Sequence, residues 1–158
     1  MKMYSLRKAE ISDKEEMALL EEKCFDQTIR ENFDFVLLSS SHRYFVVLNN
    51  LKEVIAYAGI SISYEQGDIL SVCVSPEYRK LGIAKGLMTA LLDEAKRVGV
   101  QTMFLEVEED NLPAINLYLK CGFEKISERK NYYGNKTAII MSKNLWCFAY
   151  KVLWLIIH

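Results

Sequence analysis

The sequence predicts one α/β (α+β) domain built on a mixed sheet with helices on both faces. Three observations lead to this fold class. The chain has 158 residues, which suits a single domain. Half of its residues, 51%, are hydrophobic, which is enough for one core. Strand-type and helix-type hydrophobic periods follow each other in the order β-α-α-β-β-β-α-β-α-β-β, without repeats or low-complexity linkers.

Two helices, the second of them short, are expected between the first and second strands. Ser12–Glu15 and Thr28–Glu31 are capping-box patterns that predict the starts of these helices, because apolar residues at helical spacing follow each box. Asn49-Asn50 and Gln66-Gly67 predict turns between the strands that come next. The strands expected in this half are residues 3–7, 43–48, 54–64 and 69–74.

The second half alternates helices with strands. A long helix is predicted from its apolar stripe at helical spacing, and Gly99 is expected to end it. Asn111 can cap the next helix, with Pro113 in its first turn and Gly122 at its end. The stripe consists of Ile83, Leu87, Leu91, Ala95 and Val98. The remaining expected strands are residues 102–107 and a hairpin of residues 123–133 and 137–141 around Gly134-Asn135.

The overall charge and the metal-type residues exclude several function classes. The formal net charge is −1, so no general electrostatic case exists for binding nucleic acid or an anionic membrane. The two histidines, His42 and His158, form no metal-ligand cluster, and no metal is expected. The cysteines match no zinc or disulfide framework, so reduced thiols in a cytoplasmic protein are expected. They are Cys24, Cys73, Cys121 and Cys147.

The two ends of the chain are read from their hydropathy. No apolar run follows the basic residues near the N-terminus, so a signal peptide is not expected. Residues 145–157 are almost all apolar, interrupted by Lys151, but a membrane-spanning helix needs roughly 20 such residues. We therefore expect a domain at residues 1–143 and an apolar extension at 144–158. The extension packs on the domain, supports a weak homodimer or lies on a membrane surface.

The stretch from Ser71 to Gly86 is the most informative part of the chain. It reads as a β-branched strand, a short turn and a glycine-marked helix start beside Arg79, Lys80 and Lys85. A helix N-terminus presents unpaired N–H groups and the positive end of its dipole, which suits a phosphate. The stretch lacks the ending of a P-loop and the glycine pattern of a dinucleotide site, which disfavours both ligand classes.

Two motifs carry a resemblance to a known superfamily. Arg79-x-x-Gly82-x-Ala84 resembles the coenzyme A pyrophosphate loop of the GNAT acetyltransferases. The segment that begins Leu105-Glu-Val and ends Leu-Tyr-x-x-x-Gly-Phe123 resembles the second characteristic region of the same superfamily, and the segments 129–133 and 138–141 continue the match. Together they resemble the RimI type, the ribosomal-protein alanine N-acetyltransferases.

The resemblance implies a mostly antiparallel sheet with a splayed pair of central strands, at 69–74 and 102–107. The pantetheine arm of acetyl-CoA would lie between these strands and pair with the first of them like an added strand. The cofactor-binding residues implied in this way are Val72, Cys73, Val74, Arg79, Lys80, Leu81, Gly82, Ile83, Ala84, Lys85 and Asn111.

Glu106 and Tyr118 are the expected catalytic residues by this resemblance. Glu106 would take the proton from the attacking ammonium, and its partial burial in a central strand would raise its proton affinity. Tyr118 would protonate the leaving thiolate, and the backbone N–H of Val74 could polarise the carbonyl. The alternatives are a solvent-facing Glu106 and a Tyr118 that only packs in the core. A covalent acetyl-Cys73 intermediate is not expected, because a strand setting favours a buried inert thiol.

The acceptor implied by the resemblance is a protein N-terminus, with alanine of a ribosomal protein as the type substrate. The peptide-side residues would be Arg129, Asn131, Tyr132 and Tyr133. Two departures concern this side: Asp-Gln-Thr-Ile follows Cys24-Phe25 where the family has Pro-Trp, and Glu108 replaces a frequent arginine. Two alternatives therefore stay open: a GNAT enzyme acting on a small-molecule amine or a lysine side chain, and a non-catalytic acyl-CoA-binding module.

Overall fold

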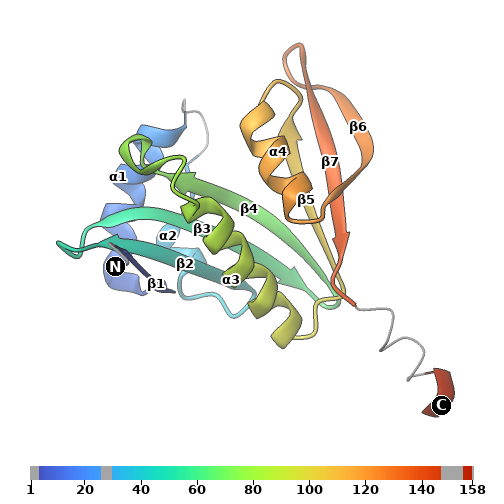
Figure 1. The fold of residues 1–158 in the computed structure, drawn as a ribbon, viewed down its shortest axis with the longest axis horizontal. Helices are drawn as coiled ribbons and strands as arrows, with labels where there is room; N and C mark the ends of the chain where they lie inside the picture. Colours follow the sequence, from blue (N-terminus) through green and yellow to red (C-terminus); the bar gives the residue numbers. More distant parts are fainter. Residues whose placement is uncertain (1–3, 26–29, 147–154, 158) are drawn as a thin grey trace.

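A seven-stranded sheet runs through the computed structural model, which describes residues 4–25, 30–146 and 155–157 (Figure 1). The strand order is β1-β2-β3-β4-β5-β7-β6. All neighbours are antiparallel except β4 and β5, so the expected mixed, mostly antiparallel sheet is confirmed. The strands are β1 Tyr4–Lys8, β2 His42–Asn49, β3 Val54–Ser63, β4 Gln66–Val74, β5 Thr102–Glu108, β6 Glu124–Tyr133 and β7 Lys136–Asn144.

Helices cover both faces of the sheet, as expected. Helix α1 and the short α2 pack on one face of β2–β4, and α3 packs on the other face. Helix α4 lies beside β5 and β7, on the same side of the sheet as α3 (Figure 1). The helices are α1 Lys14–Cys24, α2 Phe33–Val36, α3 Ile83–Arg97 and α4 Leu112–Lys120.

The parallel pair β4 and β5 separates soon after it begins. Only residues 66–68 of β4 pair with residues 102–104 of β5, and beyond this point the strands diverge (Figure 1). A bulge in β4 accompanies the divergence, because Ile69 pairs with Ile60 while Ser71 pairs with Gly59, which leaves Leu70 as the extra residue. The expected splay of the two central strands is therefore confirmed.

Local capping differs from the expectation at the first helix. Glu10 donates its backbone N–H to Asp13 Oδ2 at 2.7 Å, so the box lies two residues earlier than Ser12–Glu15 and caps a 3-10 turn that precedes α1. Helix α2 begins after Asn32, whose side chain accepts from the Phe35 N–H at 3.1 Å, while Thr28 lies outside the described residues.

The turn before β4 also differs from the expectation. Gln66 and Gly67 belong to the strand, and the chain reverses two residues earlier, at Tyr64 and Glu65. Tyr64 adopts a φ of +54°, the left-handed conformation that such a tight reversal needs. A glycine at position 67 is explained by packing instead of by a turn, because a Cβ on Gly67 would lie 2.5 Å from the sulfur of Met103 on β5.

The expectation of reduced thiols is wrong for one pair. Cys24 at the end of α1 and Cys73 in β4 form a disulfide, with their Cα atoms 6.2 Å apart. The two residues are 49 positions apart, and they meet because α1 packs across β3 and β4, which no local spacing rule reveals. Cys121 is a free thiol, and Cys147 lies outside the described residues.

The C-terminal segment begins as part of the domain. Leu145 is 6% exposed within the main core, and its N–H donates to the carbonyl of Gln101 at 2.8 Å. Residues 155–157 form a helical turn with exposed apolar side chains. In the part of the chain that the structure describes, no helix is long and apolar enough to cross a membrane.

Candidate functional site

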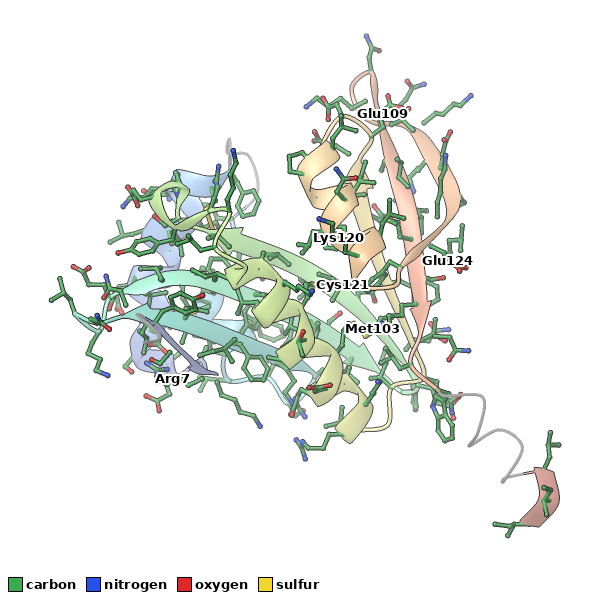
Figure 2. The ribbon with its side chains drawn as sticks, viewed as in Figure 1. Arg7, Met103, Glu109, Lys120, Cys121 and Glu124 are labelled. Atoms are coloured by element: carbon green, nitrogen blue, oxygen red, sulfur yellow. A yellow bond between two sulfur atoms is a disulfide. The ribbon has the colours of Figure 1, made fainter. Side chains whose placement is uncertain are left out.

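The divergence of β4 and β5 leaves one edge of β4 open. Val72, Cys73 and Val74 pair with β3 on one side, and the pairing with β5 has ended at Asp68. Met103 closes the narrow end of this opening by packing over Gly67 (Figure 2). An extended molecule can therefore pair with the backbone of residues 72–74 as an added strand would.

The loop after β4 places backbone donors at the mouth of the opening. Lys80 and Gly82 adopt left-handed conformations with φ of +62° and +80°, which turn the chain into α3. Within the described structure, the N–H groups of residues 80–85 reach no backbone or side-chain acceptor. A Cβ on Gly82 would meet no protein atom within 4 Å, so the space beside it is free. Free amides at the start of a fifteen-residue helix suit an anion.

Side chains brace this loop against the sheet. Arg79 Nε donates to the carbonyl of Val74 at 3.1 Å, and the hydroxyl of Tyr4 donates to the carbonyl of Leu81 at 3.2 Å. Ile83 is buried in the core, while Lys80 and Lys85 are exposed. The loop is thus held against the sheet by Tyr4, Arg79 and Ile83. The side chains of Lys80 and Lys85 point to solvent and can bind an anionic ligand.

Glu106 lies on β5 beside the opening, on the face of the sheet opposite α3 and α4, and it is exposed. Its neighbours Leu105 and Val107 point into the opposite core, which confirms the expected alternation. Glu106 Oε1 forms an ion pair of 3.0 Å with Arg129, which reaches across β7 from β6, and the Glu106 side chain is 35% exposed. Asp68 is a second carboxylate on this face, and burial together with the charge of Glu106 raises its pKa.

Tyr118 lies on α4 and belongs to the core on the α3 side. It is 9% exposed, and its ring meets the edge of Phe123 at a centroid distance of 6.1 Å. Burial, and secondarily Cys121, raises the pKa of Tyr118 to about 12, so its hydroxyl stays protonated at neutral pH. Glu106 and Tyr118 therefore belong to opposite faces of the sheet.

A shallow hollow of about 220 Å³ lies between α3 and α4. Lys85, Lys120 and the free thiol of Cys121 contribute to its walls, and Figure 2 shows Lys120 and Cys121 at the end of α4. Burial raises the pKa of Cys121, which disfavours the reactive thiolate. Among the sequence-predicted residues, only Lys85 lines this hollow.

The remaining predicted positions fall into two groups. Asn111 accepts a hydrogen bond from the N–H of Ala114 at 3.3 Å, which confirms it as the N-cap of α4. Asn131 is exposed with a φ of +57° where the β6–β7 register shifts. The side chains of Tyr132 and Tyr133 lie outside the described part, as does the segment after Phe25 that departs from the family pattern. Glu108, the other departure, pairs with Lys136 at 2.9 Å.

The sequence analysis missed a polar cluster beside the opening. The hydroxyls of Tyr44, Tyr57 and Ser71 are buried under the α1 and α2 side of the sheet, close to Glu21, which is 7% exposed. A usable signal exists in the sequence, because Tyr44 and Tyr57 are polar-tipped residues in otherwise apolar strands. Their relation to Glu21 depends on helix packing and is not encoded locally.

Known proteins are similar to this chain in sequence and in architecture. The chain is 35% identical over 91 residues to the [ribosomal protein bS18]-alanine N-acetyltransferase of Escherichia coli K12, a match that spans 55% of this chain and 62% of that protein. The chain thus spans less than two thirds of that relative's length. It is 27% identical over 147 residues to an N-alpha-acetyltransferase of Sulfurisphaera tokodaii, covering 85% of this chain and 88% of that protein.

Solved structures and a family match agree with these relatives. The crystal structure of the ribosomal-protein-S18-alanine N-acetyltransferase from Escherichia coli superposes with a TM-score of 0.83 at 27% identity, over 92% of this chain and 96% of that one. Residues 3–123 match the acetyltransferase (GNAT) family, a span that contains β4, the loop, α3, Glu106 and Tyr118. The chain belongs to the GNAT acetyltransferase family.

Proposed function

We propose that this protein is an acetyl-CoA-dependent N-acetyltransferase of the RimI type, which acts on the N-terminal α-amino group of a protein. The observation that carries the proposal is the open edge of β4 at residues 72–74, continued by free amides at the start of α3. Similarity to the bS18-alanine and N-alpha-acetyltransferases supports the acceptor class.

The residues around the opening fit acetyl-CoA. The backbone of Val72, Cys73 and Val74 would pair with the pantetheine arm, and the amides of residues 80–85 would bind the pyrophosphate. The free space beside Gly82 allows a phosphate to approach the backbone closely. Lys80 and Lys85 add positive charge, and Asn111 is proposed to contact the cofactor in addition to capping α4.

Glu106 and Tyr118 divide the proton transfers between the two sides of the opening. Acetyl-CoA supplies the acetyl group as a thioester. On the acceptor side, Glu106 takes a proton from the ammonium, which frees the nitrogen lone pair for attack on the carbonyl carbon. As the C–N bond forms and the C–S bond breaks, Tyr118 donates its proton to the sulfur. The nitrogen releases a second proton to solvent to become the neutral amide, and the Tyr118 oxygen regains a proton from solvent. A hydroxyl with a pKa of about 12 holds that proton until a thiolate develops nearby.

On the acceptor side of the opening, residues of the β6–β7 hairpin are proposed to bind the peptide. Arg129 holds Glu106 through their ion pair, and Asn131, Tyr132 and Tyr133 on the same hairpin are proposed to flank the peptide. The proposed partner is a protein N-terminus, with alanine of a ribosomal protein as the reference case, in the cytoplasm.

A second candidate function is acetylation of a small-molecule amine. The observation that favours it is the acidic character of the acceptor side, where Asp68 and Glu21 accompany Glu106 and burial raises the pKa of both additional carboxylates. Such a surface suits a compact polycation as well as a peptide.

Mass spectrometry of acetyl-CoA reactions tests the proposal. The acceptors are a peptide beginning Ala-Arg, an N-terminally blocked lysine peptide and a linear polyamine. We expect one acetyl group on the alanine α-amine and none on the blocked peptide. Acetylation of the polyamine alone would replace the protein acceptor by the second candidate. Binding of acetyl-CoA without turnover on any amine would contradict the enzymatic assignment.

A further inference from the structure

A row of three residues crosses the sheet beside the opening. Tyr44 of β2 pairs with Gly59 of β3, which pairs with Ser71 of β4, so the three lie side by side on the α1 and α2 face. A Cβ on Gly59 would lie 2.2 Å from the Tyr44 ring. Gly59 therefore lets that ring lie flat across β3, which carries its hydroxyl toward Ser71.

Three hydroxyls in this row and the next one lack hydrogen-bond partners. Tyr57 is fully buried and Tyr44 is 5% exposed. Ser71 lies near both tyrosine hydroxyls, and Glu31 lies near that of Tyr44, close enough to affect the pKa of each tyrosine. None of the three hydroxyls, however, makes a hydrogen bond of ordinary geometry within the described structure. A buried polar group without a partner costs about 1–3 kcal/mol, so native proteins retain few of them. Three together, next to the proposed reaction site, point to a ligand that completes them.

Carboxylates surround these hydroxyls. Glu21 of α1 is 7% exposed, and its Oε1 accepts the N–H of Glu31 at 3.1 Å. Burial raises the pKa of both tyrosines, and the negative charges of Glu31 near Tyr44 and of Glu21 near Tyr57 raise it further. Both hydroxyls are therefore protonated, with oxygen lone pairs available to a donor.

Two cations of the described residues lie at the edges of this group: Arg30 near Glu21, and Arg129, which pairs with Glu106 beside Asp68. The Arg30 guanidinium forms an ion pair of 2.5 Å with Glu22 and is 62% exposed, so its principal partner lies on the outer side of α1. The carboxylate of Asp68, on the same face of β4 as Ser71, makes no hydrogen bond or ion pair in the described part of the chain. The three hydroxyls and the nearby carboxylates together therefore offer more hydrogen-bond acceptors than donors.

We propose that these residues form a cation pocket, which binds a positively charged group of the acceptor next to its reacting amine. The cation pocket consists of Glu21, Glu31, Tyr44, Tyr57, Ser71 and Asp68. The inference rests on the proposed acetyl transfer, because Ser71 directly precedes the strand segment 72–74 and Asp68 neighbours Glu106.

An ammonium group matches the pocket chemically. It brings three N–H donors to the three hydroxyl oxygens and to carboxylates, and charge-assisted hydrogen bonds are the stronger kind. The ring of Phe33 stands edge-on to Tyr57 and Tyr44 at centroid distances of 5.5 and 6.2 Å, so aromatic rings also wall the site. The group comes from the first side chain of a peptide or from the second amine of a small diamine.

Acetylation kinetics with charged and neutral acceptor pairs test the pocket. One pair is a peptide whose first residue is lysine or norleucine, with every internal lysine blocked, and the other is 1,4-diaminobutane and butylamine. We expect kcat/KM to favour the charged member by at least about tenfold, the size of one charge-assisted hydrogen bond. Glu21→Gln and Tyr57→Phe should each remove most of that preference while acetyl-CoA affinity stays unchanged.

Matched variants control for general effects of charge and ring chemistry. Glu15→Gln changes an exposed glutamate of the same helix, and Tyr64→Phe changes a tyrosine that is 95% exposed, so both should keep the preference. If Glu21→Gln does not fold, Tyr57→Phe and Ser71→Ala still test the pocket, because they retain the ring and the strand.

The outcomes separate this inference from the proposed function. Acetylation of an alanine peptide with no preference for charge would keep the proposed function and overturn the pocket. Preference for the diamine, lost in Tyr57→Phe, with no peptide acetylated would support the pocket and overturn the protein acceptor. If no amine is acetylated, calorimetry with 1,4-diaminobutane decides: binding that Tyr57→Phe abolishes supports the pocket, and no binding to the wild type overturns it.

Discussion

At the scale of single residues, Glu106 has the clearest testable role. Glu106→Gln keeps the shape of the side chain and removes its capacity to take a proton. We expect kcat to fall by about 10²-fold or more, as for a lost general base, with acetyl-CoA affinity unchanged. Steady-state kinetics measure kcat, and calorimetry measures the acetyl-CoA affinity. Glu108→Gln is the matched control, since Glu108 points the same way along β5 but pairs with Lys136, and a similar loss in both variants would contradict the role.

Glu94 supplies a prediction about stability. Its side chain is 6% exposed and meets Arg97, Lys8 and Arg43, at 2.7 Å in the closest pair. Hydrogen bonds from Arg97 lower the pKa of Glu94 from 4.5 to about 2 in the folded protein. A depressed folded-state pKa stabilises the fold fully above about pH 4.5, and this contribution is lost as the pH falls toward 2.

Urea unfolding of Glu94→Gln at two pH values measures this contribution. The difference between 4.5 and about 2 corresponds to about 3 kcal/mol at neutral pH. We expect the variant to lose roughly this amount at pH 7 and clearly less at pH 3, where the wild type has lost part of the contribution. Asp93→Asn, on the exposed side of α3, should change little at either pH. A pH-independent difference for Glu94→Gln would contradict the linkage.

The single residues that sequence could identify are those whose role is local. The N-cap of Asn111 and the alternation that turns Glu106 away from Leu105 follow from rules over a few positions. The Arg129 partner of Glu106 comes from another strand across β7, and the buried hydroxyls beside Glu21 depend on how α1 packs. Contacts of this kind arise from tertiary structure and leave no local pattern.

At the scale of elements, the start of α3 depends on Gly82. Its φ of +80° disfavours any side chain, and the free space around it is where a phosphate would approach. We expect Gly82→Val to weaken acetyl-CoA binding by about tenfold or more, because the side chain occupies that space and disturbs the amides. Gly86→Ala, in open space within the helix, is the control and should bind normally. Wild-type affinity of Gly82→Val by calorimetry would refute the loop as the pyrophosphate site.

The disulfide between α1 and β4 predicts a redox dependence of stability. A bond that closes a loop of 49 residues stabilises by about 4 kcal/mol in the chain-entropy model. Thermal unfolding of the wild type should therefore shift to lower temperature in a thiol reductant. The Cys24→Ala, Cys73→Ala double variant should unfold at that lower temperature with or without reductant. An unchanged wild-type midpoint under full reduction, verified by mass spectrometry, would contradict a stabilising bond.

Element types and their order were predictable because hydrophobic period and turn residues act over short distances. The stripe of α3 and the hairpin around Gly134-Asn135 are examples. The exact starts were less predictable, because Glu10 and Asp13 compete with Ser12 for the same cap. The disulfide could not be predicted, since neither Cys24 nor Cys73 has a spacing that marks its partner.

At the scale of the whole molecule, the proposed site depends on one feature of the sheet, the early end of the pairing between β4 and β5. The sheet stops pairing between β4 and β5 after three residues, and each side of the resulting opening receives a different chemistry. The α3 and α4 side provides amides, lysines and Tyr118, whereas the α1 and α2 side provides carboxylates and hydroxyls. In the proposed reaction, an anionic donor and a cationic acceptor would therefore approach from opposite faces and meet at Glu106, as direct transfer requires.

The C-terminal segment provides the prediction that concerns assembly. Leu155, Ile156 and Ile157 are each at least 67% exposed, although they are large apolar side chains, and Trp146 is 43% exposed. Large exposed apolar side chains favour association, so we expect sedimentation velocity to show a concentration-dependent dimer that disappears when residues 147–158 are deleted. The deletion retains Leu145, because that residue is part of the core and its removal would test folding instead. Leu145→Ala is accordingly the matched variant: it should lower the unfolding temperature and keep the dimer, whereas the deletion should remove the dimer and keep the unfolding temperature of the domain. The same monomer in the full chain and the deletion variant at every concentration would refute a role of this segment in self-association.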